Sequence, residues 1–279
     1  MERNTCNETA LAFGTIALEA AKAIMAHHPS SVSSWGKPDG SPVTQGDIDA
    51  DCIIRSRLAA LMPGVMVITE ETCEAHQDTA LPDRFILVDP LDGTREFKAR
   101  RDEFTVNIAL IEAGQPIVSA LYAPALHRLY LGMREAYRVD VRPDQPLPRL
   151  DAMRKLTTNS PPAAGLRAVA SRSHLDPSTQ RWLDERRISE LCPAGSSLKF
   201  CVIAEGDADV YPRFAPTMEW DTAAGHGILA AAGGTVLGLD GAPLRYGKPG
   251  AAFRNESFVA WGQQQSSLGH PEAVASVGS

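Results

Sequence analysis

The sequence predicts a mixed α+β or α/β fold, because helical and strand patterns both recur along its 279 residues. Leu11, Leu18 and Met25 fall on one helical face, and Pro29 marks the end of that helix. Residues 85–88 form a short apolar run of β-forming residues, which indicates a buried strand. Residues 104–139 then alternate apolar stretches with turns, as a meander of strands does.

Composition indicates a globular protein with an aliphatic core. Hydrophobic residues make up 44% of the chain and aromatic residues only 6%, so aliphatic side chains and alanine must fill the interior. The net charge of −7 argues against binding to a nucleic acid polymer, which needs a basic face. The length suits one large domain or two packed halves. We expect an N-terminal α+β subdomain over residues 1–150, a C-terminal α/β subdomain over 151–262 and a disordered tail over 263–279.

The cysteines and the N-terminus indicate a cytoplasmic protein. The five cysteines are widely spaced and include no C-x-x-C pair, so we expect reduced thiols and neither a structural disulfide nor a zinc site. No basic segment followed by an apolar stretch marks a secretory signal, and no uninterrupted apolar run is long enough to span a membrane. Peripheral attachment to the inner face of the membrane is left open.

Two helices are expected before the strand-rich part of the chain. Thr5 and Glu8 have the spacing of a capping box, so we place the start of the first helix there. Thr44 can cap the second helix, and Asp47 lies in its first turn, where the helix dipole favours an anion. By itself Asp47 is therefore interpreted as a helix-start residue.

Two aspartates follow the buried strand at residues 85–88. The strand is expected to end at Asp89, because Pro90 lacks an N–H and cannot continue a ladder. Asp92 lies three positions later on a second turn, so the two carboxylates can converge on one point. Without a counterion they would repel each other and resist ionisation. A hard divalent cation such as Mg²⁺ removes that repulsion and prefers oxygen ligands.

The residues after this pair add donors for an anion. Gly93 and Thr94 can present backbone N–H groups, especially where a helix begins. Metal ligands next to N–H donors are what phosphoryl transfer requires. The alternative is that Asp-Pro and Asp-Gly only form turns, as they do in many proteins.

Further carboxylates stand at other strand and helix starts. Glu70-Glu71 follows a strand expected over residues 65–68, and the polar segment 72–84 is interpreted as a loop. Two strand ends that both carry carboxylates are the kind of geometry that builds a metal cluster. In the second half we expect strands at 167–170, 188–192, 208–211, 235–239 and 257–261, and helices over 178–187, 195–205 and 219–233. Asp221 stands at the start of the last helix, whereas His226 is interpreted as a packed or hydrogen-bonded residue.

Three motifs in this order resemble the inositol-monophosphatase superfamily of magnesium-dependent, lithium-sensitive phosphatases. They are Glu70-Glu71, Asp89-Pro-Leu-Asp-Gly-Thr94 and Trp220-Asp-Thr-Ala-Ala-Gly225. Within this superfamily the chain is most similar to the bacterial 3′(2′),5′-bisphosphate nucleotidases. The closer match is carried by residues 94–97, 103–110, 171–174, 195–200, 208–213 and 255–258, and the likeness runs from about residue 8 to residue 261. Thr69 is a departure, since many relatives have Gly or Ser before the Glu pair.

The resemblance implies a layered αβαβα sandwich and a set of site residues. It implies that two or three Mg²⁺ ions are held by Glu70, Asp89, Asp92, Asp221 and the carbonyl oxygen of Leu91. It assigns catalysis to Asp47, Thr94 and Glu70, with Thr94 hydrogen-bonded to Asp47. Substrate binding is assigned to Glu70, Leu91, Asp92, Gly93, Thr94 and Asp221, with Ser196, Lys199 and Arg213 near a distal phosphate. Arg172 and His174 are further candidates for that distal contact.

The resemblance implies hydrolysis of 3′-phosphoadenosine 5′-phosphate to AMP and phosphate by direct attack of water. It also implies lithium inhibition and a role in sulfur assimilation. An inositol phosphate or fructose 1,6-bisphosphate is the alternative substrate for the same site. A non-catalytic phosphonucleotide sensor is the alternative of a different class, although Asp47 and Thr94 favour an enzyme. A serine hydrolase is disfavoured because the chain has no G-x-S-x-G motif. A monomer and a homodimer both stay open.

Overall fold

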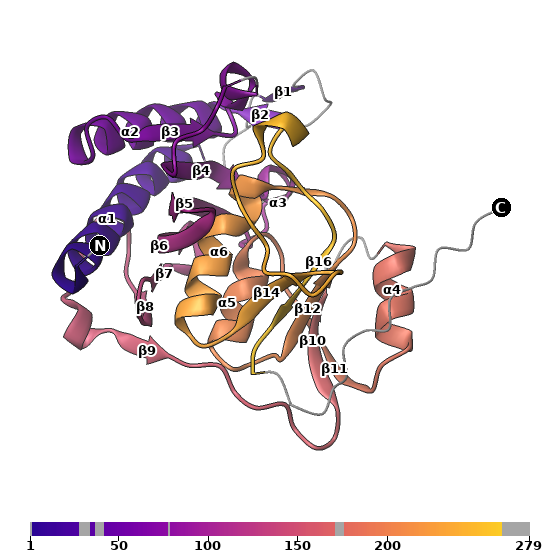
Figure 1. Cartoon of the computed structure of the whole chain (residues 1–279). Helices are drawn as coiled ribbons and strands as arrows, with labels where there is room; N and C mark the ends of the chain where they lie inside the picture. The colour runs from indigo at the N-terminus through magenta and orange to yellow at the C-terminus, as the bar shows by residue number, and fades with distance from the viewer. Residues whose placement is uncertain (1, 28–33, 37–41, 78, 171–175, 264–279) are drawn as a thin grey trace.

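Alternating layers of helices and sheets make up the computed structural model, which describes residues 2–27, 34–36, 42–77, 79–170 and 176–263 (Figure 1). The larger sheet has seven strands in the order β3-β4-β5-β6-β7-β8-β9. Its strands are β3 (Met66–Thr69), β4 (Arg84–Asp92), β5 (Thr105–Glu112), β6 (Gln115–Ala123), β7 (Arg128–Gly132), β8 (Ala136–Asp140) and β9 (Arg154–Leu156). Only the β3–β4 pair is parallel among these neighbours.

The smaller sheet has five strands in the order β11-β10-β12-β16-β14. Its strands are β10 (Leu166–Ala170), β11 (Ile188–Pro193), β12 (Val210–Arg213), β14 (Thr235–Gly238) and β16 (Phe258–Trp261). Two short pairs complete the described strands: β1 (Ser34–Gly36) with β2 (Pro42–Thr44), and β13 (Thr217–Met218) with β15 (Arg254–Asn255).

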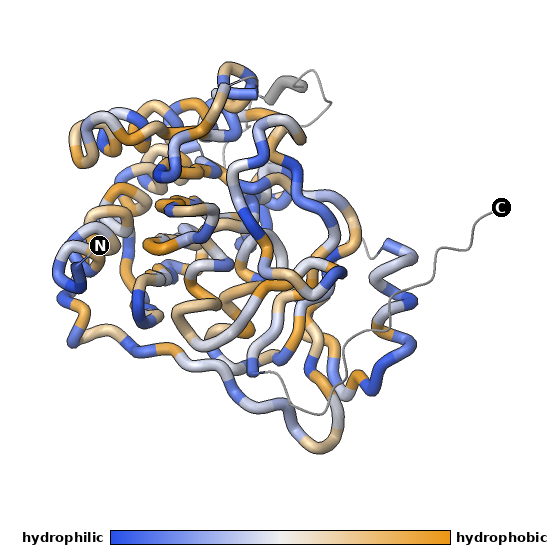
Figure 2. Tube along the Cα trace, viewed as in Figure 1, coloured by the Kyte–Doolittle hydropathy of each residue, from blue (hydrophilic) through white to orange (hydrophobic). Residues whose placement is uncertain are grey.

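Helices separate and cover the sheets. Side chains of β4 alternate between two cores, with Ile86 and Val88 packed with α1 (Arg3–Ala26) and α2 (Gln45–Leu61). Phe85 and Leu87 share the other core with α5 (Leu198–Ala204), α6 (Glu219–Ala231) and the smaller sheet. The other α-helices of the described residues are α4 (Pro177–Asp184), beside the smaller sheet, and the short α3 (Thr94–Lys98). Figure 2 shows α4 as largely hydrophilic. This arrangement confirms the expected αβαβα sandwich.

Helix α1 belongs to the core. It is long and apolar enough to cross a membrane by length and composition alone. However, Ala10, Phe13, Ala17 and Ile24 on one of its faces are fully buried, and they pack in the cluster that also contains α2 and the larger sheet. This burial is that of a core helix in a globular protein.

Several expected boundaries were wrong. Helix α1 begins at Arg3 with Glu2 at its N-cap, so Thr5 lies inside the helix and does not cap it. The reason is that Cys6 is buried in the core, which extends the packed helical face upstream. Segment 72–84, expected to be a loop, contains a short 3₁₀ helix at Cys73–His76. The helix expected over 195–205 begins only at Leu198, and the helix expected over 178–187 ends at Asp184.

The proposed boundary between the two halves crosses continuous structure. Strand β9, at Arg154–Leu156, pairs with β8 and extends the larger sheet past residue 150. Helix α6 from the second half shares a core with the larger sheet. The division at residue 150 stays a prediction, and residues 264–279 of the expected tail lie outside the described part of the chain.

We predict that Gly132→Ala destabilises the fold. A Cβ at this position would lie 2.7 Å from Cα of Ile228, so the backbones of β7 and α6 would have to separate. Such overpacking costs about 1–3 kcal/mol in free energy of unfolding. Gly250→Ala is the matched control, because its Cβ meets nothing within 4 Å. Equal denaturation midpoints for both variants in urea would contradict the close approach.

Candidate active site

A bulge in β4 presents the two aspartates of the central motif. Asp89 pairs with Asn107 and Asp92 pairs with Thr105, and the register shifts between them. The expectation that the strand ends at Asp89 was therefore wrong: it continues to Asp92 through an irregular stretch. The backbone N–H of Leu91 donates to Oδ1 of Asp89 at 3.0 Å, which fixes the turn inside the bulge. The bulge accommodates Pro90 without a regular ladder at that point.

Carboxylates from separate segments gather around Asp89. Its side chain is buried, and burial raises its pKa well above the ordinary range. The charges of Glu70, Asp92, Asp221 and Asp47 raise this pKa further, in that order. Burial and then the charge of Asp92 also raise the pKa of Asp221. The acid that follows β3, the acids of β4 and the acid of α6 therefore lie close enough together to repel one another.

Asp92 is held by the loop before α5. Its Oδ2 accepts hydrogen bonds from the backbone N–H of Ser197 at 2.7 Å and from the hydroxyl group of Ser196. The Ser197 hydroxyl lies 2.6 Å from the same oxygen and 2.5 Å from the carbonyl oxygen of Asp221. Asn107 donates to this hydroxyl at 3.0 Å. Ser197 thus serves two acidic residues, and its side chain makes no capping hydrogen bond to α5.

Asp221 is the third residue of α6 and closes a turn onto the residue before the helix. Its Oδ2 accepts from the backbone N–H of Met218 at 2.8 Å. Asp47 has the corresponding position in α2, where its Oδ2 accepts from the N–H of Thr44 at 2.8 Å. Both carboxylates therefore accept from the backbone N–H of the residue before their helix, as the helix-start position predicted for Asp47.

Asp47 and Thr94 meet although 47 positions separate them. The Thr94 hydroxyl lies 3.3 Å from Oδ1 of Asp47 and 3.2 Å from the carbonyl oxygen of Leu91. Gly93, at the N-cap of α3, has φ +90°, and a Cβ there would lie 3.1 Å from the carbonyl oxygen of Glu103. Gly93 therefore permits both the left-handed backbone and the close approach.

A cavity of about 480 Å³ opens beside these acids. Asp92, Gly93 and Asp221 line one part, and the cationic side chains in its wall are Arg95, Arg101, Lys199 and Arg213. Carboxylates and cations thus share a single cavity, as a site for metal ions and a multiply charged anion would require.

Lys199 is the most buried of these cations, with 7% of its surface exposed. Its Nζ donates to the carbonyl oxygen of Ser196 at 2.8 Å and lies 5.5 Å from the ring centre of Tyr211. Burial lowers the pKa of Lys199 to about 8, partly offset by the charge of Asp92. Arg213 donates to the carbonyl oxygens of Ala215 at 3.1 Å and of Pro216 at 3.4 Å.

The remaining expected site residues differ in where they lie. Ser196 is held at the carboxylate end of the cavity by Asp92 and by Thr105, whose hydroxyl is 2.8 Å away. Arg172 and His174 lie outside the described residues. His226 is buried and 3.1 Å from the hydroxyl of Tyr246, and burial lowers its pKa to about 4. It is a hydrogen-bonded core residue, as the sequence indicated.

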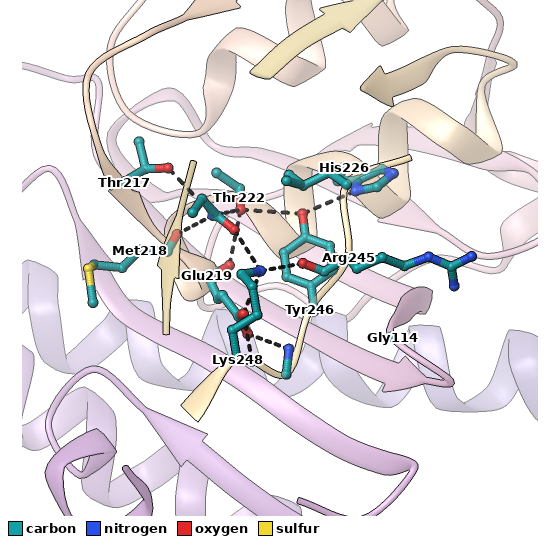
Figure 3. A network of polar contacts seen from close by, with 12 residues as sticks. Gly114, Thr217, Met218, Glu219, Thr222, His226, Arg245, Tyr246 and Lys248 are labelled. Carbon is teal, nitrogen blue, oxygen red and sulfur yellow. Dashed lines mark hydrogen bonds and ion pairs between the residues drawn. The ribbon is translucent and has the colours of Figure 1, made fainter. Parts of the chain in front are cut away.

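Sequence reasoning missed the polar residues that surround the acids. Asn107 and Ser197 were noted only as parts of longer matching segments, and only their position beside acids on neighbouring elements reveals a role. Glu219, which is fully buried, accepts hydrogen bonds from the backbone N–H groups of Gly247 and Lys248 at 2.7 and 3.0 Å (Figure 3). The sequence signal that could have identified Glu219 is its position directly before Trp220-Asp221.

The donor set suits magnesium. Within the described ranges, no three side chains of His, Cys, Asp or Glu close into a metal cage by themselves. The nearby acids nevertheless all supply oxygen. Burial and then the charges of the neighbouring acids raise the pKa of Asp89, and a hard divalent cation would neutralise the negative charge gathered there. Thr69 tightens the turn that carries Glu70, because its hydroxyl lies 3.0 Å from that of Thr72. Thr69, where many relatives have Gly or Ser, therefore helps to hold the turn before Glu70 in shape.

We predict that the metal-free protein loses stability as the pH rises through the raised pKa values of Asp89 and Asp221. Below about pH 4 both groups are protonated in the folded and unfolded chains. Above it the unfolded chain releases these protons, while the folded chain retains them, so the free energy of unfolding falls with pH until the folded groups ionise too. Thermal unfolding in EDTA across this range measures the slope.

Two comparisons isolate the cause of that slope. Asp89→Asn should flatten it, because the amide does not ionise. Mg²⁺ at about 100 times its Kd should add about 2.7 kcal/mol to the wild type and oppose the loss at high pH. Identical slopes in EDTA for the wild type and Asp89→Asn would show that the acid cluster does not cause the pH dependence.

The chain is similar to known proteins over nearly its whole length. A model described as the inositol monophosphatase family matches residues 3–269. The 3′(2′),5′-bisphosphate nucleotidase CysQ of Escherichia coli strain K12 is 42% identical over 223 residues, which cover 80% of this chain and 86% of that protein. The nucleotidase CysQ of Haemophilus influenzae is 31% identical over 252 residues, or 89% of this chain and 91% of the relative.

A solved structure shows the same fold. The crystal structure of CysQ from Bacteroides thetaiotaomicron, described as a bacterial member of the inositol monophosphatase family, superposes with a TM-score of 0.78 at 34% identity. The likeness covers 93% of this chain and 98% of that structure.

Proposed function

The chain belongs to the inositol monophosphatase family, and from this premise we propose that it is a magnesium-dependent 3′(2′),5′-bisphosphate nucleotidase. The proposed reaction hydrolyses the 3′-phosphate of 3′-phosphoadenosine 5′-phosphate to give AMP and inorganic phosphate. The observation that carries it is one cavity that joins clustered carboxylates to cations, among them the buried Lys199. The curated relatives named above are nucleotidases of this type.

Glu70, Asp89, Asp92, Asp221 and the carbonyl oxygen of Leu91 would hold two or three magnesium ions. Bound magnesium would offset charge on the phosphoryl oxygens and favour ionisation of the attacking water. Asp92 and Asp221 suit this role because each is anchored through one oxygen, by Ser197 and by Met218 respectively. The other oxygen of each carboxylate then remains for a cation.

The protein's own groups would bind the phosphate and move the proton. The N–H groups of Gly93 and Thr94 hold the phosphoryl oxygens. Water attacks the phosphorus and the bond to the 3′ oxygen breaks. That oxygen takes a proton from solvent water, and the proton taken up by Asp47 later returns to the solvent, so the reaction balances. The water proton passes to Oγ1 of Thr94, whose own proton moves to Asp47, 3.3 Å away. Glu70 would take part by helping to hold a magnesium ion, and no phosphoenzyme forms.

The cations at the other part of the cavity favour a substrate with a second phosphate. Lys199 and Arg213 lie in the cavity wall beside Tyr211, whose ring is 5.5 Å from Nζ of Lys199. We assign the distal phosphate to Lys199 and Arg213. We assign Ser196 to the support of Asp92, because its hydroxyl hydrogen-bonds to that carboxylate.

The alternative substrates and the sensor role have less support than the nucleotidase activity. An inositol phosphate or fructose 1,6-bisphosphate would use the same acids, but the curated relatives named above favour a nucleotide. A sensor would need the phosphate cradle without the water-activating pair, yet Asp47 and Thr94 lie within reach of each other. We place the enzyme in the cytoplasm and leave monomer and homodimer open. We do not propose attachment to the membrane surface, because no observation supports it.

A substrate panel tests the proposed activity. With Mg²⁺ the protein should release phosphate from 3′-phosphoadenosine 5′-phosphate faster than from inositol 1-phosphate or fructose 1,6-bisphosphate, and lithium should inhibit it. Asp92→Asn should abolish release, because it removes a metal-binding charge. Preference for a sugar phosphate would overturn the nucleotidase assignment alone, and absence of phosphate release from all three would overturn the enzymatic one.

Lys199→Met tests the distal-phosphate site. Loss of a charge-assisted hydrogen bond costs about 1.5–3 kcal/mol, so kcat/KM for the bisphosphate should fall about tenfold to a hundredfold. Activity on 3′-AMP, which lacks the second phosphate, should change far less. Arg128→Met, which changes a cation outside the cavity wall, is the control. An equal loss on both nucleotides would show that Lys199 serves the fold or the metal end instead.

A further inference from the structure

Residues 245–255, which we call the strap, hold the start of α6 against the larger sheet. At one end Nη1 of Arg245 donates to the carbonyl oxygen of Ala113 at 3.0 Å, and the N–H of Tyr246 donates to Gly114 at 3.1 Å. At the other end β15 pairs with β13, the two residues before α6. The strap therefore connects the β5–β6 turn at Gly114 to Met218 and Glu219 at the start of α6 (Figure 3), and Asp221 follows in the same helix.

Glu219 is a buried acid that the strap contacts through Gly247 and Lys248. It is fully buried at the first position of α6 and receives N–H donors from Gly247 and Lys248. The Lys248 ammonium group lies 2.7 Å from its Oε1. A carboxylate this deeply buried requires such a partner, because unpaired burial costs several kcal/mol.

All the N–H donors of the Lys248 ammonium group face acceptors within the protein. Besides Glu219, its Nζ donates to the carbonyl oxygen of Arg245 and to Oδ1 of Asn255 at 3.3 Å. An ammonium group has three N–H donors. Since all three have acceptors, Lys248 is a structural cation and not a phosphate ligand.

Asn255 links Lys248 to the start of α6 by hydrogen bonds. It is buried, and its Nδ2 donates to the carbonyl oxygen of Met218 at 3.0 Å and to Oγ1 of Thr222 at 2.9 Å. Its Oδ1 accepts from Lys248, so both ends of the amide are used. An amide can accept and donate at once, whereas a carboxylate or an alkyl group cannot do both.

These contacts converge on Asp221 and on the cavity wall. Met218, fixed by Asn255, donates its own N–H to Oδ2 of Asp221 at 2.8 Å. Thr217 and Thr222, the residues on either side of the turn, line the cavity, and both hydroxyls lie within 3.4 Å of Nδ2 of Asn255. We propose that Lys248 and Asn255 are positioning residues that act through Glu219 and Met218 to set the carboxylate of Asp221. The inference rests on the proposed role of Asp221 in magnesium binding.

Magnesium binding without substrate tests the proposal. Titration calorimetry should show Asn255→Ala binding Mg²⁺ about tenfold to a hundredfold more weakly than the wild type, the loss typical of residues that orient metal ligands. Its kcat at limiting Mg²⁺ should fall, and excess Mg²⁺ should restore part of it, while KM for the bisphosphate changes less. Lys155→Met is the control, because Lys155 lies on the edge strand β9 and the change breaks only its ion pair with Glu135.

A second variant covers the case in which Asn255→Ala fails to fold. The double change Lys248→Met with Glu219→Gln removes the ion pair without leaving a buried charge, and its Mg²⁺ affinity should fall by a similar factor. The proposal is overturned if folded variants bind Mg²⁺ as the wild type does and lose only thermal stability. If the wild type itself binds no Mg²⁺, the proposed function fails, and this inference with it. If the wild type binds Mg²⁺ and the folded variants bind it equally well, only this inference fails and the proposed function stands.

Discussion

The repulsion between buried carboxylates is the constraint on which this structure depends. Asp89 is buried with the charges of Glu70, Asp92, Asp221 and Asp47 near it, and each opposes its ionisation. Hydrophobic packing alone cannot hold such a group together, because charged groups lose hydration when they are buried. The fold fixes the acids with hydrogen bonds from hydroxyl and backbone N–H groups, and it leaves a surplus of negative charge that divalent cations can neutralise.

The acids come from both halves of the chain, so the interface between the layers is also part of the site. Helix α6 brings Asp221 toward β4, and this is possible because Gly132 lets Ile228 approach β7 closely. Ser197, before α5, then reaches Asp92 across the same interface. Loosening of this packing would move the acids of the cluster apart. Under the proposed function, the stability of the core and the affinity for magnesium would therefore be coupled.

Much of the fold and the main acids could be predicted from the sequence, because both leave local patterns. Periodicity indicated most helices and strands, and the carboxylates stood at recognisable strand and helix starts. Local patterns could not show that β4 continues through Pro90 as a bulge, which depends on pairing with β5. They also could not show that Ser197 serves Asp92, or that Lys248 pairs with Glu219, since these contacts join residues far apart in the chain.

The most direct test of the central claim is a crystal structure of the protein soaked with Mn²⁺, an oxygen-seeking substitute for Mg²⁺ that scatters anomalously. The account predicts anomalous peaks bounded by the carboxylates of Asp89, Asp92 and Asp221, and loss of the peaks in crystals of Asp89→Asn. Ions bound only at other acidic surfaces, with this cluster empty at saturating Mn²⁺, would contradict it.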